Sequence, residues 1–233
     1  MAHKTGVTDL DAFAEEFSFW AETFEQDRYD RVLRVLPQRA DRILDAGCGS
    51  GGVSLRLANH GRHVVGTDDS PSMIALAKKR QSEHRKNNVD FVVADLARLP
   101  FAEQTFDFVV SNSALHHTRL DLSLPELRRV IKGGGQMFLR DLVASFPRLY
   151  TYPAWQVLRA LMGAPNYARS HGLRTMVRIL SFRTSPAWFR HVSEPAWVTP
   201  EAFQEAYSRF LPGCKFERLG WEMTAFWEAP REG

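Results

Sequence analysis

The feature that most constrains the fold is a repeated alternation of short apolar runs with longer amphipathic stretches between residues 42 and 140. Five runs have the length and composition of β-strands: 42–45, 63–67, 89–94, 106–110 and 136–140. Helices are expected between them at 53–60, 71–86 and 125–132, the last ended by Gly133, Gly134 and Gly135. Strands that alternate with helices form a parallel sheet covered on both faces, so the expected fold class is α/β and doubly wound.

Both ends of the chain follow other patterns. Thr199 begins a helix that we expect to end near Phe210, and an antiparallel hairpin follows, with strands at 215–219 and 223–228. The first 36 residues are expected to form two helices, the second running from Tyr29 to Leu36. Large apolar side chains share one face of the first helix, and we expect them to fold over the ligand site: Phe13, Phe17, Trp20 and Phe24.

A glycine-rich loop follows the first expected strand and opens a helix, with the sequence GCGSGG at 47–52. Glycine lets the backbone adopt positive φ and approach a ligand closely, and the helix N-terminus beyond offers unpaired N–H groups. Gly47, Gly49 and Gly52 also match the pattern GxGxxG, so the loop alone does not separate NAD from other nucleotide-like ligands.

Three consecutive expected strands end in an aspartate at the carboxyl edge of the sheet, where doubly wound folds bind ligands: Asp45, Asp68 and Asp95. Asp45 has the wrong charge for a pyrophosphate and suits a ligand with a positively charged end. Asp68 stands where a carboxylate accepts hydrogen bonds from ribose hydroxyls, and Asp95 stands where a side chain meets an adenine edge. Solvated loop acids would explain any one of them, but the three together with the loop favour a binding site.

Composition excludes several classes of protein. The chain has 233 residues, 44% hydrophobic and 24% charged, which suits one globular domain with elaborations. We expect no transmembrane segment and no signal peptide, because no apolar run is long enough and the N-terminus is charged. The two cysteines, Cys48 and Cys214, form no zinc-like cluster, which favours a reducing, cytoplasmic location. Residues 142–193 hold seven arginines, eight aromatic residues and no lysine or acid, a shift that marks a boundary.

Several stretches resemble the motifs of one family: ILDAGCGSG at 43–51, GTDDS at 66–70 followed by Met73, ADL at 94–96 with LPF at 99–101, and FDFVV at 106–110 with ALHH at 114–117. They are similar to class I S-adenosylmethionine (SAM) methyltransferases, in particular the small-molecule branch that includes ubiquinone and menaquinone enzymes (methyltransferase type 11). The similarity covers about residues 17–141 and resumes at 199–228.

The resemblance implies a Rossmann-like seven-stranded sheet of order 3-2-1-4-5-7-6, with strand seven antiparallel. It also implies SAM as cofactor and S-adenosylhomocysteine (SAH) as product. The implied cofactor contacts are Asp45, Gly47, Cys48, Gly49, Asp68, Asp69, Met73, Ala94, Asp95, Leu96, Asn112, Trp20 and Phe24. Phe24 departs from the family, in which a tyrosine often closes over the cofactor.

Catalytic roles stay open. His116 and His117 are candidates for a general base, although the pair is common in this family at the exit of strand four. Asp141, at the end of strand five, would orient or deprotonate a substrate or cap the turn. Residues 112–113 lack the Asx-Pro-Pro-aromatic motif that nucleic-acid base methyltransferases carry at this place. Asn112 also stands where catechol-type enzymes have a metal-binding aspartate. We therefore expect no metal and no nucleic-acid partner.

We expect N-terminal helices over the cofactor site at 1–36, a SAM-binding core at 37–141 and 199–233, and an inserted helical substrate cap at 142–198. The expected function is methyl transfer from SAM to an oxygen, nitrogen or carbon atom of a small, largely apolar or aromatic metabolite, with or without an anionic group. The alternative is an enzyme that binds SAM but catalyses a non-methylating cyclisation or isomerisation.

Three roles remain for the cap arginines. They reach solvent while the aromatic residues line an apolar pocket, they bind a carboxylate or phosphate of the substrate, or they dock on an anionic membrane surface or a carrier protein. The sequence leaves the acceptor atom and the oligomeric state open.

Overall fold

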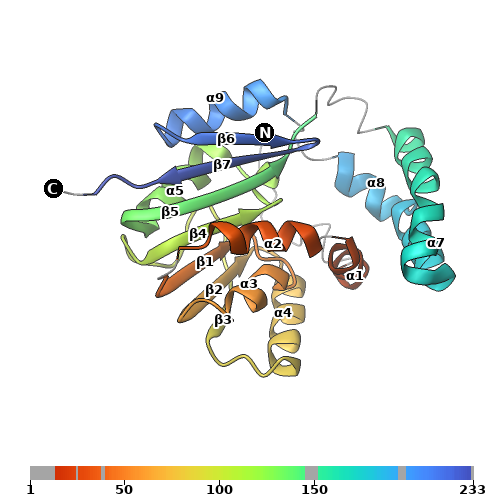
Figure 1. Ribbon diagram of the computed structural model, residues 1–233, viewed down its shortest axis with the longest axis horizontal. Coiled ribbons are helices and arrows are strands. Elements are labelled where there is room, and N and C mark those ends of the chain that lie inside the picture. The colour runs from red at the N-terminus through yellow and green to blue at the C-terminus, as the bar shows by residue number, and fades with distance from the viewer. Residues whose placement is uncertain (1–13, 25, 38–39, 145–151, 194–197, 232–233) are drawn as a thin grey trace.

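A computed structural model describes residues 14–24, 26–37, 40–144, 152–193 and 198–231. Its described part contains a twisted seven-stranded sheet with helices on both faces, and further helices that stand beyond one edge of the sheet (Figure 1). Phe13, one member of the expected apolar stripe, lies outside the described residues, and so does the side chain of Phe24.

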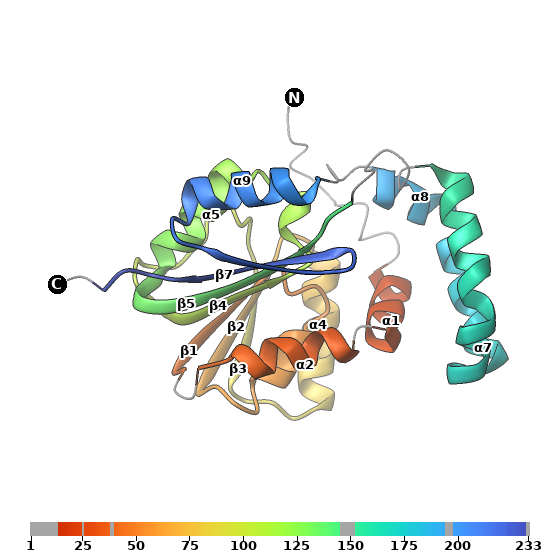
Figure 2. The same ribbon diagram turned by 45° about the horizontal axis from the view of Figure 1, so that its top comes forward.

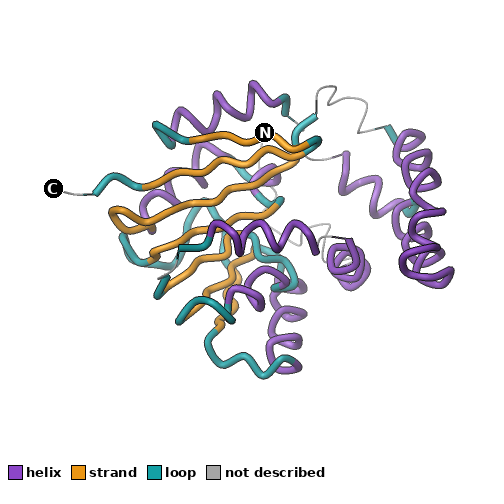
Figure 3. Tube along the Cα trace, viewed as in Figure 1, coloured by secondary structure: helices purple, strands orange, loops and turns teal. Residues whose placement is uncertain are grey.

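The sheet has the order β3-β2-β1-β4-β5-β7-β6, as expected. Its strands are β1 (Arg42–Ala46), β2 (His63–Asp68), β3 (Val89–Val93), β4 (Phe106–Asn112), β5 (Ile131–Leu142), β6 (Lys215–Leu219) and β7 (Glu222–Glu228). The first five strands pair in parallel, whereas β7 pairs antiparallel with both β5 and β6. Parallel pairing brings the carboxyl ends of β1 to β5 to one edge (Figure 3).

Each face of the sheet has its own apolar core because neighbouring strand residues point in opposite directions. Ile43 and Phe108 belong to the core beneath α2 (Gln26–Val35), α3 (Gly52–Leu57) and α4 (Pro71–Glu83). Leu44 and Val109 belong to the core beneath α5 (Leu120–Val130) and α9 (Pro200–Phe210). Figure 2 shows these two helical layers on opposite sides of the sheet.

Three helices lie beyond the edge at which β5 ends: α1 (Ala14–Phe24), α7 (Pro153–Arg183) and α8 (Pro186–Ser193) (Figure 1). Gly172 divides α7 into two helical segments, because its φ of 82° and ψ of 164° are not helical. The Arg-rich part of the sequence therefore folds as α7 and α8, and both stand over the edge to which the expected ligand residues belong.

One expectation about the glycines at 133–135 is wrong. They do not end a helix at 125–132, because α5 ends at Val130 and the glycines lie within β5. The ladder is irregular there, since Phe106 pairs with Ile131 whereas Phe108 pairs with Gln136. A Cβ on Gly135 would lie 3.0 Å from the carbonyl oxygen of Asp107, so the close approach of two backbones requires glycine.

Smaller differences affect helix ends. The second helix begins at Gln26, earlier than expected, while α3 ends at Leu57 and α4 at Glu83, both earlier than expected. The expected cap of α9 is confirmed, because the side chain of Thr199 accepts a hydrogen bond from the amide of Ala202 at 3.2 Å.

Candidate active site

The glycine-rich loop crosses from β1 to α3 at the carboxyl edge of the sheet. The amide groups of Gly47 and Cys48 both donate to the carbonyl oxygen of Thr67 at 2.8 Å. A Cβ on Gly47, where φ is 75°, would lie 2.2 Å from the Cβ of Ala114, so only glycine fits. Gly49 also has positive φ, 52°, but a Cβ there would meet no atom within 4 Å. The loop is therefore packed at Gly47 and open at Gly49, where a ligand can approach the backbone.

Asp68 ends β2 and joins the loop to the turn before α4. Its Oδ2 atom accepts the Gly49 N–H at 2.9 Å, and its Oδ1 atom accepts the Ser70 N–H at 3.0 Å. The residue is 8% exposed, so these bonds hold the carboxylate in one orientation. The carboxylate of Asp68 therefore lies beside Gly49, where the loop is open to a ligand.

Asp45 is a buried carboxyl group in β1, only 1% exposed. The hydroxyl group of Ser54 donates to its Oδ2 atom at 2.6 Å. Burial raises the pKa of Asp45 to about 7, although the hydrogen bonds from Ser54 act in the opposite direction. A positive ligand group nearby would favour the charged form. Burial likewise raises the pKa of the neighbouring Cys48 thiol, which therefore stays protonated and unreactive.

The remaining residues expected at the cofactor divide into two groups. Asp69 and Asp95 are exposed on the loops that follow β2 and β3. Three others are buried near the ends of these strands: Met73, Ala94 and Leu96. The Ala94 amide donates to the carbonyl oxygen of Asp68 at 3.0 Å, so the ends of β2 and β3 are joined directly.

Asn112, at the end of β4, contacts an ion pair that sequence reasoning missed. Its side-chain oxygen accepts a hydrogen bond from Arg140, which lies opposite it in β5. Arg140 is fully buried, and its Nε–H donates to Glu222 of β7 at 2.8 Å. The partners are 82 residues apart, and only the insertion of β7 beside β5 brings them together.

His116 and Asp141 meet at the exit of β4. His116 belongs to the short 3-10 helix η2 (Leu115–His117), and its Nδ1 atom lies 2.5 Å from Asp141 Oδ1. The His116 amide also donates to Asp141 Oδ2 at 2.8 Å. Because a carboxylate oxygen accepts hydrogen bonds, the Nδ1 atom of His116 donates in this contact. This is the arrangement of a base that a carboxylate orients.

His117 stands between His116 and a third histidine, His191 of α8. The ring centroids are 4.0 Å and 5.0 Å apart, respectively. His117 keeps an exposed edge, yet desolvation by the surrounding protein lowers its pKa well below the usual histidine value. The charges of His116 and His191 act in the same direction. Sequence reasoning missed His191, since neither of the two histidines in the Arg-rich segment carries a signal of a partner near strand four.

The first helix contacts the glycine loop through its polar side chains. The hydroxyl oxygens of Ser18 and Ser50 are 2.7 Å apart. Glu22 forms an ion pair with Arg80 of α4 at 2.6 Å, and Arg80 donates to the Ser50 carbonyl oxygen at 2.8 Å. These contacts fix α1 beside the loop.

The apolar side chains of α1 contact the cap instead. The ring centroids of Phe17 and His191 are 5.4 Å apart, and those of Trp20 and Trp188 are 5.5 Å apart. The stripe thus joins α1 to α8, and α1 connects the glycine loop with the cap. A contact of Trp20 or Phe24 with the cofactor stays a prediction.

A cavity of about 80 Å³ lies beside His116 and Asp141, with Phe203 and Tyr207 in its wall. It has room for water molecules but is far smaller than sites that hold metabolites, which occupy roughly 300–1,000 Å³. Within the described ranges, no group of three or more His, Cys, Asp or Glu side chains is arranged to hold a metal ion. Of the helices that the structure describes, none is long and apolar enough to cross a membrane.

These features fit the SAM molecule that the sequence resemblance implies. The free space at Gly49 would admit a ligand against the backbone, and Asp68 beside it would accept hydroxyl groups. Asp45 is a buried carboxyl group that a cationic ligand would stabilise in its ionised form.

Comparison with known proteins agrees with this geometry. The family described as Methyltransferase domain (Methyltransf_11) matches residues 44–139. This range contains the glycine loop and the first five strands, apart from the start of β1 and the end of β5. A demethylmenaquinone methyltransferase of Clavibacter sepedonicus is 37% identical over 183 residues, 78% of this chain and 68% of that protein. The demethylmenaquinone methyltransferase of Thermobifida fusca is 27% identical over 218 residues, 86% of each chain.

A solved structure from Methanococcus maripaludis, assigned as a SAM-dependent methyltransferase, shares the fold. It has a TM-score of 0.67 and 14% identity, and the match covers 100% of this chain and 99% of that one. The sheet order, the motifs and the relatives agree, and the chain belongs to the class I SAM-dependent methyltransferases that act on small molecules.

Proposed function

We propose that this enzyme transfers the methyl group of SAM to an oxygen, nitrogen or carbon atom of a small, largely apolar or aromatic metabolite bound under α7 and α8. One observation carries the proposal. The glycine loop is open at Gly49, and the Asp68 carboxylate lies next to it, at the end of the sheet beside which α7 and α8 stand. The names of two relatives, both demethylmenaquinone methyltransferases, support an aromatic acceptor of the quinone class.

The cofactor would lie along the ends of the first three strands. Asp45 and Gly47 would hold its methionine end, Asp68 would accept the ribose hydroxyls, and Asp95 would lie near the adenine. Support comes from the raised pKa of Asp45, because the ammonium group of the ligand would compensate the buried carboxylate.

The acceptor would lie between η2 and α8, where His117 and His191 face each other. SAM supplies a methyl group that its sulfonium already activates, so the protein mainly aligns the reactants and excludes water. Such positioning lowers a barrier by about 7–11 kcal/mol. For an acceptor that must lose a proton, the Nε2 atom of His116 would receive it while Asp141 holds the ring.

The outer face of α7 would rest on an anionic membrane surface. Leu158, Leu161 and Met162 share one face of its first segment, and they are 47%, 54% and 71% exposed. On the second segment of α7, the side chains of Leu173 and Val177 share one face and are likewise exposed. Exposed apolar side chains together with arginines, in a segment without acids, suit a negatively charged lipid surface.

Product analysis tests the proposed reaction. The enzyme is incubated with SAM and a panel of hydroquinones, phenols and aromatic carboxylates, and mass spectrometry follows SAH and the methylated acceptor. Equal amounts of both products support methyl transfer. An acceptor that is consumed without SAH formation would instead support the non-methylating cyclisation or isomerisation.

A further inference from the structure

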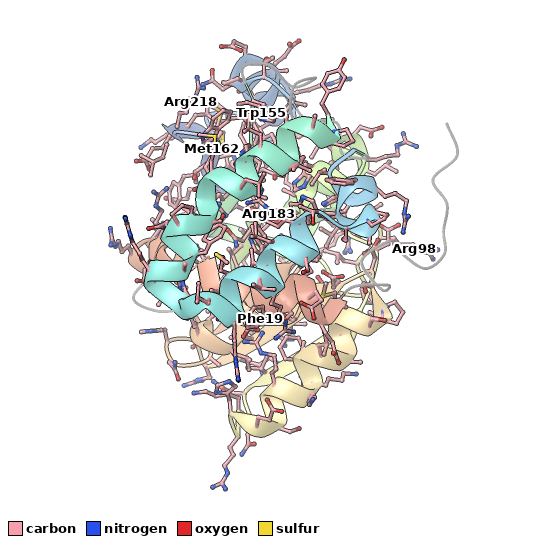
Figure 4. The ribbon with its side chains drawn as sticks, turned by 90° about the vertical axis from the view of Figure 1, so that its right-hand side faces the viewer. Phe19, Arg98, Trp155, Met162, Arg183 and Arg218 are labelled. Carbon is pink, nitrogen blue, oxygen red and sulfur yellow. The ribbon has the colours of Figure 1, made fainter. Side chains whose placement is uncertain are left out.

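Arg183, at the end of α7, is one of two buried arginines in the described part of the chain. It is 7% exposed, and Figure 4 shows it between the two segments of α7, whereas Met162, on the first segment, is 71% exposed. The other buried arginine, Arg140, has Glu222 as its partner. Arg183 has no such partner, because no described carboxylate forms an ion pair with it and residues 142–193 contain no acid at all.

The polar contacts of Arg183 leave part of its guanidinium unsatisfied. Its Nη1 atom donates to the hydroxyl oxygen of Tyr167 at 3.2 Å. Its Nε–H is buried and has no hydrogen-bond partner among the described residues. A buried charge of this kind is costly unless an anion compensates it, and the cationic fork of arginine matches a carboxylate or a phosphate.

A second unsatisfied donor lies beside Arg183. The guanidinium carbon lies 5.5 Å from the ring centroid of Trp188, and the indole Nε1–H of Trp188 is likewise buried without a partner in the described ranges. Neither of these N–H groups can act as an acceptor. A ligand oxyanion in this region would supply the acceptor that both buried donors lack.

This site is close to the place proposed for methyl transfer. Trp188 contacts His191, with ring centroids 5.7 Å apart, and His191 contacts His117 at 5.0 Å. A chain of ring contacts therefore leads from Arg183 through Trp188 and His191 to His117.

We infer that Arg183, with the indole N–H of Trp188, binds a carboxylate or phosphate group of the methyl acceptor. The inference rests on the proposed function and narrows it to anionic aromatic acceptors. Two other arginines of the Arg-rich segment have partners of their own. Arg178 pairs with Glu16 at 2.9 Å, and the guanidinium carbon of Arg159 lies 5.8 Å from the ring centroid of Trp221.

Calorimetry on the SAH-saturated enzyme tests the inference, with benzoate and phenyl phosphate as anionic probes and benzyl alcohol as the neutral probe of similar size. The buffer contains neither phosphate nor carboxylate. We expect the parent enzyme to prefer at least one anionic probe, and Arg183→Gln to weaken that probe by about 10–100-fold without changing benzyl alcohol binding. Arg174→Gln is the matched control, since Arg174 is exposed on the same helix.

Trp188→Phe keeps an aromatic ring and removes the second donor, so it should weaken binding of the same probe by a smaller factor. This variant replaces Arg183→Gln in the test if Arg183→Gln does not fold. The inference is overturned if the parent shows no preference for either anion, or if the arginine control and Arg183→Gln have the same effect. SAH affinity separates the two proposals. Loss of SAH binding in the parent would contradict the proposed function, whereas normal SAH binding without anion preference contradicts only the role of Arg183.

Discussion

The Nδ1 atom of His116 lies 2.5 Å from a carboxylate oxygen of Asp141, and this contact joins the exit of β4 to the end of β5. Asp141 is 2% exposed and also accepts the amide of Leu142 at 2.8 Å. The carboxylate therefore cannot rotate freely, and the imidazole ring that it holds has a fixed orientation. A fixed ring at the end of β4 is suited to receive a proton or to align an acceptor.

Asp141→Asn tests which of these roles applies. The amide would not accept all three N–H groups, so the His116 ring would lose its orientation. If His116 removes a proton, kcat should fall by about 10²–10⁴-fold while SAH affinity stays within a factor of two or so. Asp121→Asn, an exposed surface change, should leave both quantities unaltered.

Asp68→Ala should weaken SAM binding by about 1.5–3 kcal/mol, because a charge-assisted hydrogen bond to the ribose is lost. The change also removes the acceptor of the Gly49 amide, so the loop should become less ordered. Calorimetric titration with SAH measures the effect, and Glu103→Ala, at an exposed position just before β4, is the control. Parental affinity in the Asp68 variant would show that the ribose lies elsewhere.

Asp45 should make stability depend on pH. Its folded-state pKa of about 7 lies above its value in the unfolded chain, 3.8, so the folded protein holds the extra proton between these limits. The free energy of unfolding should therefore fall as pH rises from about 4 to about 7, with a slope of up to about 1.4 kcal/mol per pH unit from this group, and then level off. Urea unfolding of the parent and Asp45→Asn at several pH values measures the difference. Parallel profiles for the two proteins would contradict the prediction.

The first helix should contribute to cofactor affinity through its contacts with the loop. Removal of residues 1–26 should leave the sheet folded but weaken SAM binding, because Ser18 and Glu22 no longer hold Ser50 and Arg80. Glu22→Gln should reproduce part of this loss without shortening the chain, and Glu15→Gln, at an exposed position on the same helix, should not. If titration finds full SAH affinity after the truncation, α1 serves only to pack against α8.

Local sequence patterns were sufficient to predict the strands and the glycine-rich loop, whereas the order of the strands was implied by the resemblance to a family. The loop depends on glycines within one short stretch, and the aspartates belong to strand ends that alternation alone places at one edge. The glycines at 133–135 misled the prediction because glycine both ends helices and permits irregular strand pairing. Only the pairing of β5 with β4 distinguishes the two cases.

Contacts between distant segments could not be predicted. The Arg140–Glu222 pair needs β7 beside β5, and the contact of His117 with His191 needs α8 to lie beside η2. Composition indicated that some cap arginine lacks a local acid. It did not indicate Arg183, because burial depends on how the two segments of α7 pack.

The outer face of α7 provides the last prediction. The parent enzyme should sediment with phosphatidylglycerol vesicles at low salt but not with pure phosphatidylcholine vesicles, and added salt should release it. Arg169→Gln with Arg174→Gln should weaken vesicle binding by about 1 kcal/mol per arginine, since both residues are exposed on α7. Leu161→Ser with Met162→Ser should weaken it further by removing the exposed apolar contact.

Lys79→Gln on α4, an exposed cation away from the cap, controls for net charge. If Lys79→Gln weakens binding as much per charge as the two arginine changes, and the serine changes have no effect, net charge alone drives binding. Capture by an acidic carrier protein without vesicle binding would assign this face to a protein partner instead.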